Sequence, residues 1–179
     1  MMEPAVFLDR DGVIIVDKDF YFDIHTSEFF PDTILALLSV DSRFRKVVIS
    51  NQSGVARGLF TADDVDEFNE QLSRKLSAEG VHIDAWYFCP HGPDDGCVCR
   101  KPKPGMLVQA ARELSLDLKN SWIIGDKTSD IMAGRAAGAR TILVTTGYAG
   151  REPGSSTVNP DHSVDNLLQA VDLINRSVG

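Results

Sequence analysis

Two carboxylates stand one residue apart near the start of the chain, directly after an apolar run. The run spans residues 5–8, and Asp9 and Asp11 follow it, with Gly12 next. Four apolar residues in succession predict a buried strand, since the run is too short for a helix. A carboxylate can attack phosphorus at neutral pH without first losing a proton, and a second carboxylate can pass protons. The alternative is that the two acids only begin a polar turn.

Polar side chains follow two more apolar runs in the same way. Ser50 follows residues 46–49, and Asp126 comes shortly after residues 122–124. In open α/β sheets, ligands bind beyond the carboxyl ends of the strands. We therefore expect these side chains and the two aspartates near the N-terminus to share one crevice.

Several carboxylates in one crevice repel each other unless cations offset their charge. Asp130, four residues after Asp126, adds a further acid to the group. Mg²⁺ suits such a set because it prefers carboxylate and carbonyl oxygens. Lys101 and Lys127 can supply more positive charge, although Lys127 can equally be a surface residue. A metal, lysines and a hydroxyl together favour transfer of a phosphoryl group, whose oxygens need electrostatic stabilisation.

Apolar runs and helical patterns alternate along the chain, which predicts an α/β fold with a mostly parallel sheet flanked by helices. Five strands are expected, at residues 5–8, 46–49, 84–88, 122–124 and 141–144. Helices are expected from Pro31 to about Val40, from the capping box of Thr61 and Asp64 to about Glu79, and from Pro104 through 114. A fourth helix is expected after the acids at 126–130, with its end at Gly138, and a fifth over 167–174. Residues 14–30 are expected to form a turn and flap over the crevice, and residues 147–161 a loop.

Length and net charge limit the number of domains and the kinds of partner that we expect. The chain has 179 residues, which predicts one domain over 1–179, and its net charge is -8. An acidic chain argues against a nucleic-acid partner, because such partners usually require a basic face. The sequence shows no signal peptide and no apolar run of bilayer length, so we expect a cytoplasmic protein without a membrane partner. We also expect a monomer.

All the cysteines of the chain lie in one short stretch that also contains a histidine. The four residues are Cys89, His91, Cys97 and Cys99. An odd number of clustered cysteines is a poor disulfide framework, whereas three thiolates and an imidazole match structural zinc sites. We therefore expect a structural Zn²⁺ that fixes this loop and points Arg100 and Lys101 into the crevice. The alternative is three free thiols beside an exposed histidine.

Together the motifs resemble those of haloacid dehalogenase-like phosphatases. The four segments read DRDGV at 9–13, SNQSG at 50–54, KP at 101–102 and GDKTSD at 125–130. Each is weak alone, but all four occur in the order and setting of the family. The resemblance implies a doubly wound sheet, flanked by helices and without a large cap domain.

The resemblance also implies a role for each site residue. Asp9 would be the nucleophile and Asp11 the general acid and base, while Ser50 and Lys101 would bind the transferring phosphoryl group.

A catalytic Mg²⁺ would be held by the carboxylates of Asp9 and Asp126 and by the backbone carbonyl of Asp11. Lys127 and Asp130 would support this site, and whether Asp130 ligates the metal directly stays open.

Within the family, the chain resembles the phosphatases that remove the 7-phosphate of heptose 1,7-bisphosphate on the way to nucleotide-activated heptose for lipopolysaccharide. The similarity rests on FLDRDG at 7–12, NQSGVARG at 51–58, the cysteine loop and RKPKPGM at 100–106. The partner would be a small phosphorylated sugar. Its contacts are expected from Arg10, Asp17, Phe20, Asn51, Gln52, Ser53, Arg57 and Arg100. For Arg57 the alternative is a solvated loop residue.

Histidinol-phosphate phosphatases are the second candidate, because a short cysteine loop, with five residues between His91 and Cys97, is also typical of them. Those enzymes typically carry an acid in place of Ser53 and lack the VARG segment at 55–58, which favours the heptose enzymes. Ile15 stands where an asparagine is often found, and so departs from the pattern. A polynucleotide 3′-phosphatase and a non-catalytic sugar-phosphate binder stabilised by zinc are further alternatives. The acidity of the chain argues against the first, and the intact pair of aspartates argues against the second.

Overall fold

A parallel β-sheet forms the centre of the molecule, as the computed structural model shows for residues 2–18 and 25–177. Its strand order is β3-β2-β1-β4-β5-β6, and every neighbouring pair runs parallel. The strands are β1 (Ala5–Leu8), β2 (Arg45–Asn51), β3 (Ala85–Cys89), β4 (Trp122–Gly125), β5 (Arg140–Val144) and β6 (His162–Val164). The first strand therefore lies inside the sheet, where all four of its residues are buried.

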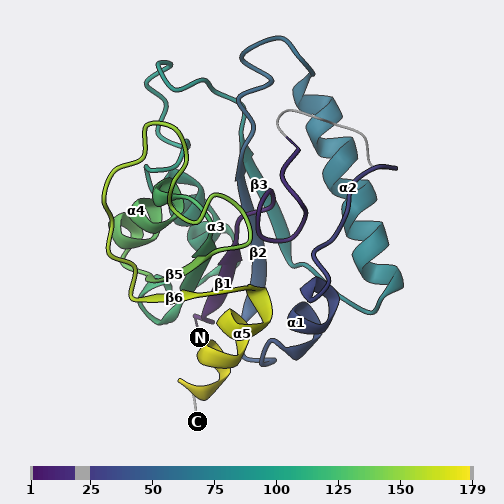
Figure 1. The fold of residues 1–179 in the computed structure, drawn as a ribbon, viewed down its shortest axis with the longest axis vertical. Coiled ribbons are helices and arrows are strands. Elements are labelled where there is room, and N and C mark those ends of the chain that lie inside the picture. Colours follow the sequence, from purple (N-terminus) through teal and green to yellow (C-terminus); the bar gives the residue numbers. More distant parts are fainter. Residues whose placement is uncertain (1, 19–24, 178–179) are drawn as a thin grey trace.

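Helices cover both faces of this sheet (Figure 1). They are α1 (Thr33–Ser39), α2 (Ala62–Ala78), α3 (Gly105–Leu114), α4 (Thr128–Ala137) and α5 (Leu167–Arg176), with a short 3₁₀ turn, η1 (Leu118–Asn120). Alternate residues of β1 enter different cores: Val6 and Leu8 pack with α1, α2 and α5, whereas Ala5 and Phe7 pack with α3 and α4. This two-sided burial is why the strand reads as a continuous apolar run.

The expected helix boundaries are largely confirmed. Thr61 and Asp64 form the capping box that precedes α2, with the Asp64 amide donating to Thr61 Oγ1 at 3.1 Å and the Thr61 amide to Asp64 Oδ2 at 2.6 Å. Gly138 ends α4 with a φ of 81°, a conformation that glycine adopts without strain. The first helix begins at Thr33, two residues later than expected from Pro31.

The expected five-stranded sheet is wrong, because the described residues form six strands. The additional strand, β6, pairs with β5 in the register His162 with Ile142. It has only three residues, of which two are exposed, because it lies at the edge of the sheet. Without an apolar run, nothing in the local pattern distinguishes it from the preceding loop.

No helix within 2–18 and 25–177 is both long and apolar enough to cross a membrane. The described residues after β1, β2, β3, β4 and β5 supply the side chains around the site.

Candidate functional site

A cavity of about 760 Å³ opens beyond the carboxyl ends of the central strands. Its walls come from the segment after β1, the loop after β2, the cysteine loop and the segments after β4 and β5. Lining side chains include Asp11, Gln52, Arg100, Lys101, Lys127 and Tyr148. The segments after these strands thus share one cavity, as expected, and Asp11 lines it. Asp9, Ser50 and Asp126 are buried and are not among the lining residues.

Lys101 joins two aspartates at the floor of this site. Its Nζ lies 3.0 Å from Asp9 Oδ1 and 2.6 Å from Asp130 Oδ1, and it donates to the Ile49 carbonyl at 3.0 Å. All three charged residues are at most 4% exposed. Burial, followed by the charge of Asp130, raises the pKa of Asp9. Burial acts to lower the pKa of Lys101, but Asp130 and Asp9 outweigh it and raise that pKa.

Asp126 follows β4 and lies against two glycines. A Cβ on Gly12 or on Gly147 would overlap the Asp126 carboxylate, so both positions require glycine. The Tyr148 amide donates to Asp126 Oδ2 at 2.8 Å, whereas Oδ1 is buried without a hydrogen-bond partner among the described residues. Burial, and then the charge of Asp9, raises the pKa of Asp126 to about 8.

These acids are arranged as a metal site would require. Asp9, Asp126 and Asp130 each offer one carboxylate oxygen, and the three atoms lie within 4.8 Å of one another. Oδ1 of Asp126 has no partner among the described residues, and burial together with neighbouring carboxylates raises the pKa of both Asp9 and Asp126, so a bound cation would stabilise their charged forms. A hard divalent cation such as Mg²⁺ fits this donor set. Asp130 is already engaged by Lys101 and by the Lys127 amide, which donates to Asp130 Oδ2 at 3.1 Å.

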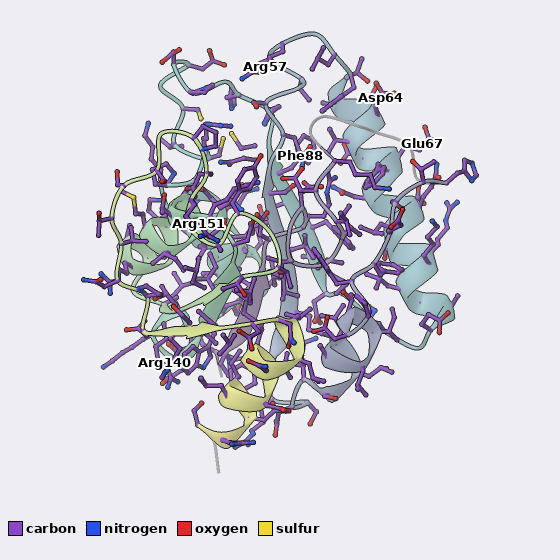
Figure 2. All side chains as sticks on the ribbon, viewed as in Figure 1. Arg57, Asp64, Glu67, Phe88, Arg140 and Arg151 are labelled. Carbon is purple, nitrogen blue, oxygen red and sulfur yellow. The ribbon has the colours of Figure 1, made fainter. Side chains whose placement is uncertain are left out.

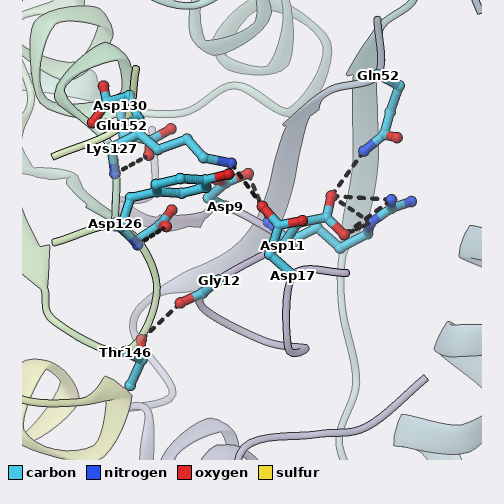
Figure 3. Close-up of polar contacts among 12 residues, drawn as sticks. Asp9, Asp11, Gly12, Asp17, Gln52, Asp126, Lys127, Asp130, Thr146 and Glu152 are labelled. Carbon is cyan, nitrogen blue, oxygen red and sulfur yellow. Dashed lines mark hydrogen bonds and ion pairs between the residues drawn. The ribbon is translucent and has the colours of Figure 1, made fainter. Parts of the chain in front are cut away.

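Asp11 lies at the wall of the cavity and is held by two side chains (Figure 3). Arg10 Nη2 is 3.0 Å from Asp11 Oδ2, and Arg10 Nε lies 3.3 Å from Oδ1. Gln52 Nε2 donates to Oδ2 at 2.9 Å. Burial acts to raise the pKa of Asp11, but the charge and hydrogen bonds of Arg10 and Gln52 outweigh it, so that pKa lies below its usual value.

Ser50 and Asn51 lie at the end of β2, beside Lys101. Ser50 is 1% exposed, and its Oγ has no hydrogen-bond partner among the described residues. Asn51 holds the backbone of Lys101 from both sides: Nδ2 donates to the Lys101 carbonyl at 2.9 Å, and the Lys101 amide donates to Oδ1 at 3.1 Å. Asn51 therefore helps to place the lysine, in addition to lining the cavity.

The remaining predicted substrate contacts divide into two groups. Ser53, Asp17 and Arg100 line the cavity, and Asp17 pairs with Lys127 at 3.1 Å, which places that lysine at the cavity and not on the open surface. Arg57 is exposed on the loop before α2 and is not among the lining residues (Figure 2). Phe20 lies outside the described residues.

The cysteine loop brings its four predicted ligands together. Cys89 Sγ lies 3.1 Å from Cys99 Sγ and 3.7 Å from Cys97 Sγ, and His91 Nδ1 lies 3.3 Å from Cys99 Sγ. All four ligand atoms lie within 4.8 Å of one another. Tetrahedral Zn–S bonds of about 2.3 Å require ligand separations of this size. Arg100 follows directly and donates from Nη1 to the His91 carbonyl at 3.1 Å.

Sequence reasoning missed the contribution of the loop after β5. Besides the Tyr148 contact, the Gly150 amide donates to the Asp126 carbonyl at 2.7 Å, and Thr146 Oγ1 donates to the Gly12 carbonyl at 2.7 Å. Glu152 accepts from the amide of Thr128 at 2.7 Å, at the start of α4. Figure 3 shows the hydrogen bond between Thr146 and Gly12. The signal in the sequence was Gly147, which only the close approach to Asp126 explains.

The chain is similar to known phosphatases over nearly its whole length. A family model described as HAD-hydrolase-like matches residues 98–170. The D-glycero-beta-D-manno-heptose-1,7-bisphosphate 7-phosphatase of Pasteurella multocida is 39% identical over 88% of this chain and 90% of that protein. The enzyme of the same name from Haemophilus ducreyi is 35% identical over 98% of this chain and 100% of that protein.

A solved structure leads to the same conclusion. The D,D-heptose 1,7-bisphosphate phosphatase from B. bronchiseptica, complexed with magnesium and phosphate, aligns with a TM-score of 0.84. It is 33% identical and covers 97% of this chain and 99% of its own. The chain therefore belongs to the haloacid dehalogenase-like hydrolases, and among them to the family of the D-glycero-beta-D-manno-heptose-1,7-bisphosphate 7-phosphatases.

Proposed function

We propose that this chain is a Mg²⁺-dependent phosphatase that removes the 7-phosphate of D-glycero-D-manno-heptose 1,7-bisphosphate through an aspartyl-phosphate intermediate. The observation that carries this proposal is the buried cluster of Asp9, Asp126 and Asp130, in which Asp9 pairs with Lys101 of the cavity wall. The chain is also about 40% identical to enzymes of that name over most of its length. The proposal extends to residues 1–179 acting as one phosphatase domain, and as a monomer.

In the first step, the carboxylate of Asp9 attacks phosphorus and forms an acyl-phosphate bond. The bond between phosphorus and the sugar oxygen breaks, and Asp11 donates a proton to the departing alkoxide. The negative charge of the incoming phosphate raises the pKa of Asp11 from its low value in the free chain, so that Asp11 takes up this proton as the substrate binds. The ammonium of Lys101 lies 3.0 Å from buried Asp9 and offsets part of the negative charge that an incoming phosphoryl group meets there, and a bound Mg²⁺ would offset more of it.

In the second step, water attacks the phosphorus of the acyl phosphate. Asp11 takes a proton from that water, the bond between phosphorus and Asp9 breaks, and inorganic phosphate leaves. One residue thus serves as acid and then as base, which its place at the cavity wall allows.

Positive charge and donors around the reacting group come from the chain and from the metal. Lys101 and Ser50 are the proposed protein donors to the phosphoryl oxygens. Asp9, Asp126 and the backbone carbonyl of Asp11 would hold Mg²⁺, which when bound neutralises charge that builds up on those oxygens. The Tyr148 amide keeps Asp126 oriented for this task.

Addition of Mg²⁺ is expected to raise the melting temperature more at about pH 8 than at about pH 5. In the folded, metal-free chain Asp126 has a pKa of about 8, against about 3.9 in the unfolded chain. Between these values the folded state keeps a proton that the unfolded state loses, so this group lowers stability as the pH rises. Once Asp126 has lost its proton, bound Mg²⁺ offsets the cost of its buried negative charge. Thermal melts with and without Mg²⁺ at the two pH values measure this gain in stability. The Asp126→Asn variant should lose the difference, and a larger effect at the lower pH would contradict the assignment.

We further propose that the four cysteine-loop ligands hold a structural Zn²⁺. All four positions are protein atoms, which leaves no open position for a reacting water. Three of the ligands precede Arg100 and Lys101 by at most ten residues, so the ion would fix the segment that carries the phosphate-binding lysine.

Removal of zinc by a strong chelator is expected to lower the melting temperature by about 6–12 °C, which for a chain of this size corresponds to about 3 kcal/mol. Phosphatase activity should fall with it, because Lys101 loses its support. Metal analysis should find about one zinc per chain before treatment. Activity should return on adding Zn²⁺ together with Mg²⁺ but not with Mg²⁺ alone. Full activity after complete removal of the zinc would disprove the structural role.

Substrate preference distinguishes the proposed function from its nearest alternative. Steady-state hydrolysis of heptose 1,7-bisphosphate and of histidinol phosphate should be compared under identical Mg²⁺ concentrations. We expect kcat/KM to favour the heptose by at least about 100-fold, the range that a few hydrogen bonds to substrate supply. A preference for histidinol phosphate would overturn the substrate, and hydrolysis of neither would favour a binding protein.

A further inference from the structure

Arg10 lines the cavity, yet almost all of its side chain is buried. Its side chain is 3% exposed, and its guanidinium contacts other side chains on several sides. Nε and Nη2 face the carboxylate of Asp11, while Nη1 donates to Asn69 Oδ1 at 2.9 Å. The carbon of the guanidinium lies 4.7 Å from the centre of the Phe68 ring. The arginine is therefore held between the site and helix α2.

Asn69 is the polar exception on the buried face of α2. The other buried residues of this helix are Val65, Phe68, Leu72 and Leu76, and Asn69 is itself only 5% exposed. A buried amide without a partner costs free energy, so its presence among apolar residues requires a partner. That partner is Arg10, which lies 59 positions away in the sequence.

These contacts form one path from the helix to the cavity. Phe68 and Asn69 fix the guanidinium by its face and by Nη1, which leaves the remaining nitrogens as a planar fork toward Asp11. An arginine fork sets the plane of the carboxylate that it binds. Gln52 holds Asp11 Oδ2 from another direction at 2.9 Å. The carboxylate is thus fixed in place at the cavity wall.

We propose that Asn69 and Phe68 are positioning residues, which hold the guanidinium of Arg10 so that it fixes the Asp11 carboxylate for proton transfer. This inference rests on the proposed role of Asp11 and adds to it two residues on α2, of which Phe68 lines the cavity and Asn69 does not. It also gives Arg10 the support of Asp11 as a role beside the substrate contact expected from the sequence.

The two chemical steps make this proposal testable with an aryl phosphate. When p-nitrophenyl phosphate transfers its phosphoryl group to Asp9, the phenolate leaves without needing a proton. Hydrolysis of the acyl phosphate still requires Asp11 to take a proton from water. A poorly placed Asp11 should therefore slow the second step and spare the first.

The Asn69→Leu variant removes the acceptor while keeping a side chain of similar size. We expect a rapid release of about one nitrophenolate per chain, at a rate within about threefold of the parent chain, followed by turnover about 10 to 100 times slower. With a sugar phosphate, where both steps need Asp11, kcat should fall by a similar factor while KM stays within about threefold. A parallel loss in both phases, or no loss, would overturn the proposal.

Matched variants separate positioning from simple damage to the helix. Asn69→Asp keeps the acceptor oxygen and should restore turnover to within about threefold of the parent. Glu70→Leu introduces the same side chain at the next, exposed position of α2 and should leave both phases unchanged. If Asn69→Leu does not fold, Phe68→Leu preserves an apolar core and should show a smaller version of the same effect. If Asn69→Asp were as impaired as Asn69→Leu, the hydrogen bond would not be the cause.

The aryl substrate keeps this test independent of the sugar. If the chain prefers another phosphate ester, the proposed substrate fails while the difference between the two phases remains. If the parent chain forms no phosphoenzyme at all, the mechanism fails first, and the positioning role fails with it.

Discussion

The Asp9→Asn variant is expected to lose at least about 10⁴-fold in phosphate release, the order seen when an enzyme loses its nucleophile. Asparagine has the same shape as aspartate, but its amide cannot form the acyl-phosphate bond. The Arg10 amide donates to Asp9 Oδ1 at 2.8 Å, and the side-chain oxygen of asparagine can accept the same hydrogen bond. The fold should therefore persist while the chemistry stops.

Stability of this variant provides an internal check. Burial raises the pKa of Asp9, which shows that its charge is costly in the metal-free chain. A neutral asparagine should leave the melting temperature of that chain unchanged or higher. Asp66→Asn, the same exchange at an exposed position of α2, is the control and should retain full activity. Phosphate release by Asp9→Asn within about tenfold of the parent chain would exclude the covalent mechanism.

The Lys101→Met variant is expected to lose both activity and stability. The methionine fills the space of the aliphatic part of the lysine side chain. It leaves Asp9 and Asp130 as buried carboxylates without the ammonium, which in the parent chain lies 3.0 Å from Asp9 Oδ1 and 2.6 Å from Asp130 Oδ1. Breaking a buried ion pair by removal of one partner costs about 3–5 kcal/mol. Loss of a donor to the phosphoryl group should lower kcat by about 100- to 1000-fold in addition. Denaturant unfolding and steady-state kinetics measure the two effects.

A double variant separates these two contributions. Lys101→Met combined with Asp130→Asn removes one of the orphaned charges, so it should recover part of the lost stability and none of the lost activity. Lys119→Met, at an exposed position, controls for the exchange itself. Wild-type stability in the single variant would show that the two carboxylates are neutral in the folded chain, which contradicts the ion pairs described here.

Much of the fold could be predicted because local patterns decided it. The apolar run before Asp9 is buried on both faces of the sheet, and the capping box at Thr61 and the glycine at 138 mark helix ends by local hydrogen bonding and backbone geometry. The edge strand β6 could not be predicted, because its pairing with β5 gives little burial and so leaves no apolar pattern.

The same distinction between local patterns and tertiary contacts applies to the site. Residue type and spacing identified the acids after β1 and β4 and the four cysteine-loop ligands. In the structure Asp9, Asp126 and Asp130 form one cluster, and the cysteine-loop ligands form a second, separate cluster. The contacts of Tyr148 and Asn69 were missed, because a backbone amide carries no signal in the sequence and a single buried amide resembles a surface residue. The role of Arg10 depends on which way its side chain turns, and only the packing of α2 determines that.

The place of β1 inside the sheet has a consequence for how this enzyme can change over evolutionary time. The amide of Asp9 donates to the Ile124 carbonyl of β4 at 3.0 Å, so the proposed nucleophile is anchored inside the sheet and its amide proton should exchange slowly. The residues proposed to contact the sugar lie mainly on loops, and loops open locally at low cost. Substitutions there can alter which phosphate ester is accepted without loosening the chemical centre, so new specificities can arise on an unchanged catalytic sheet.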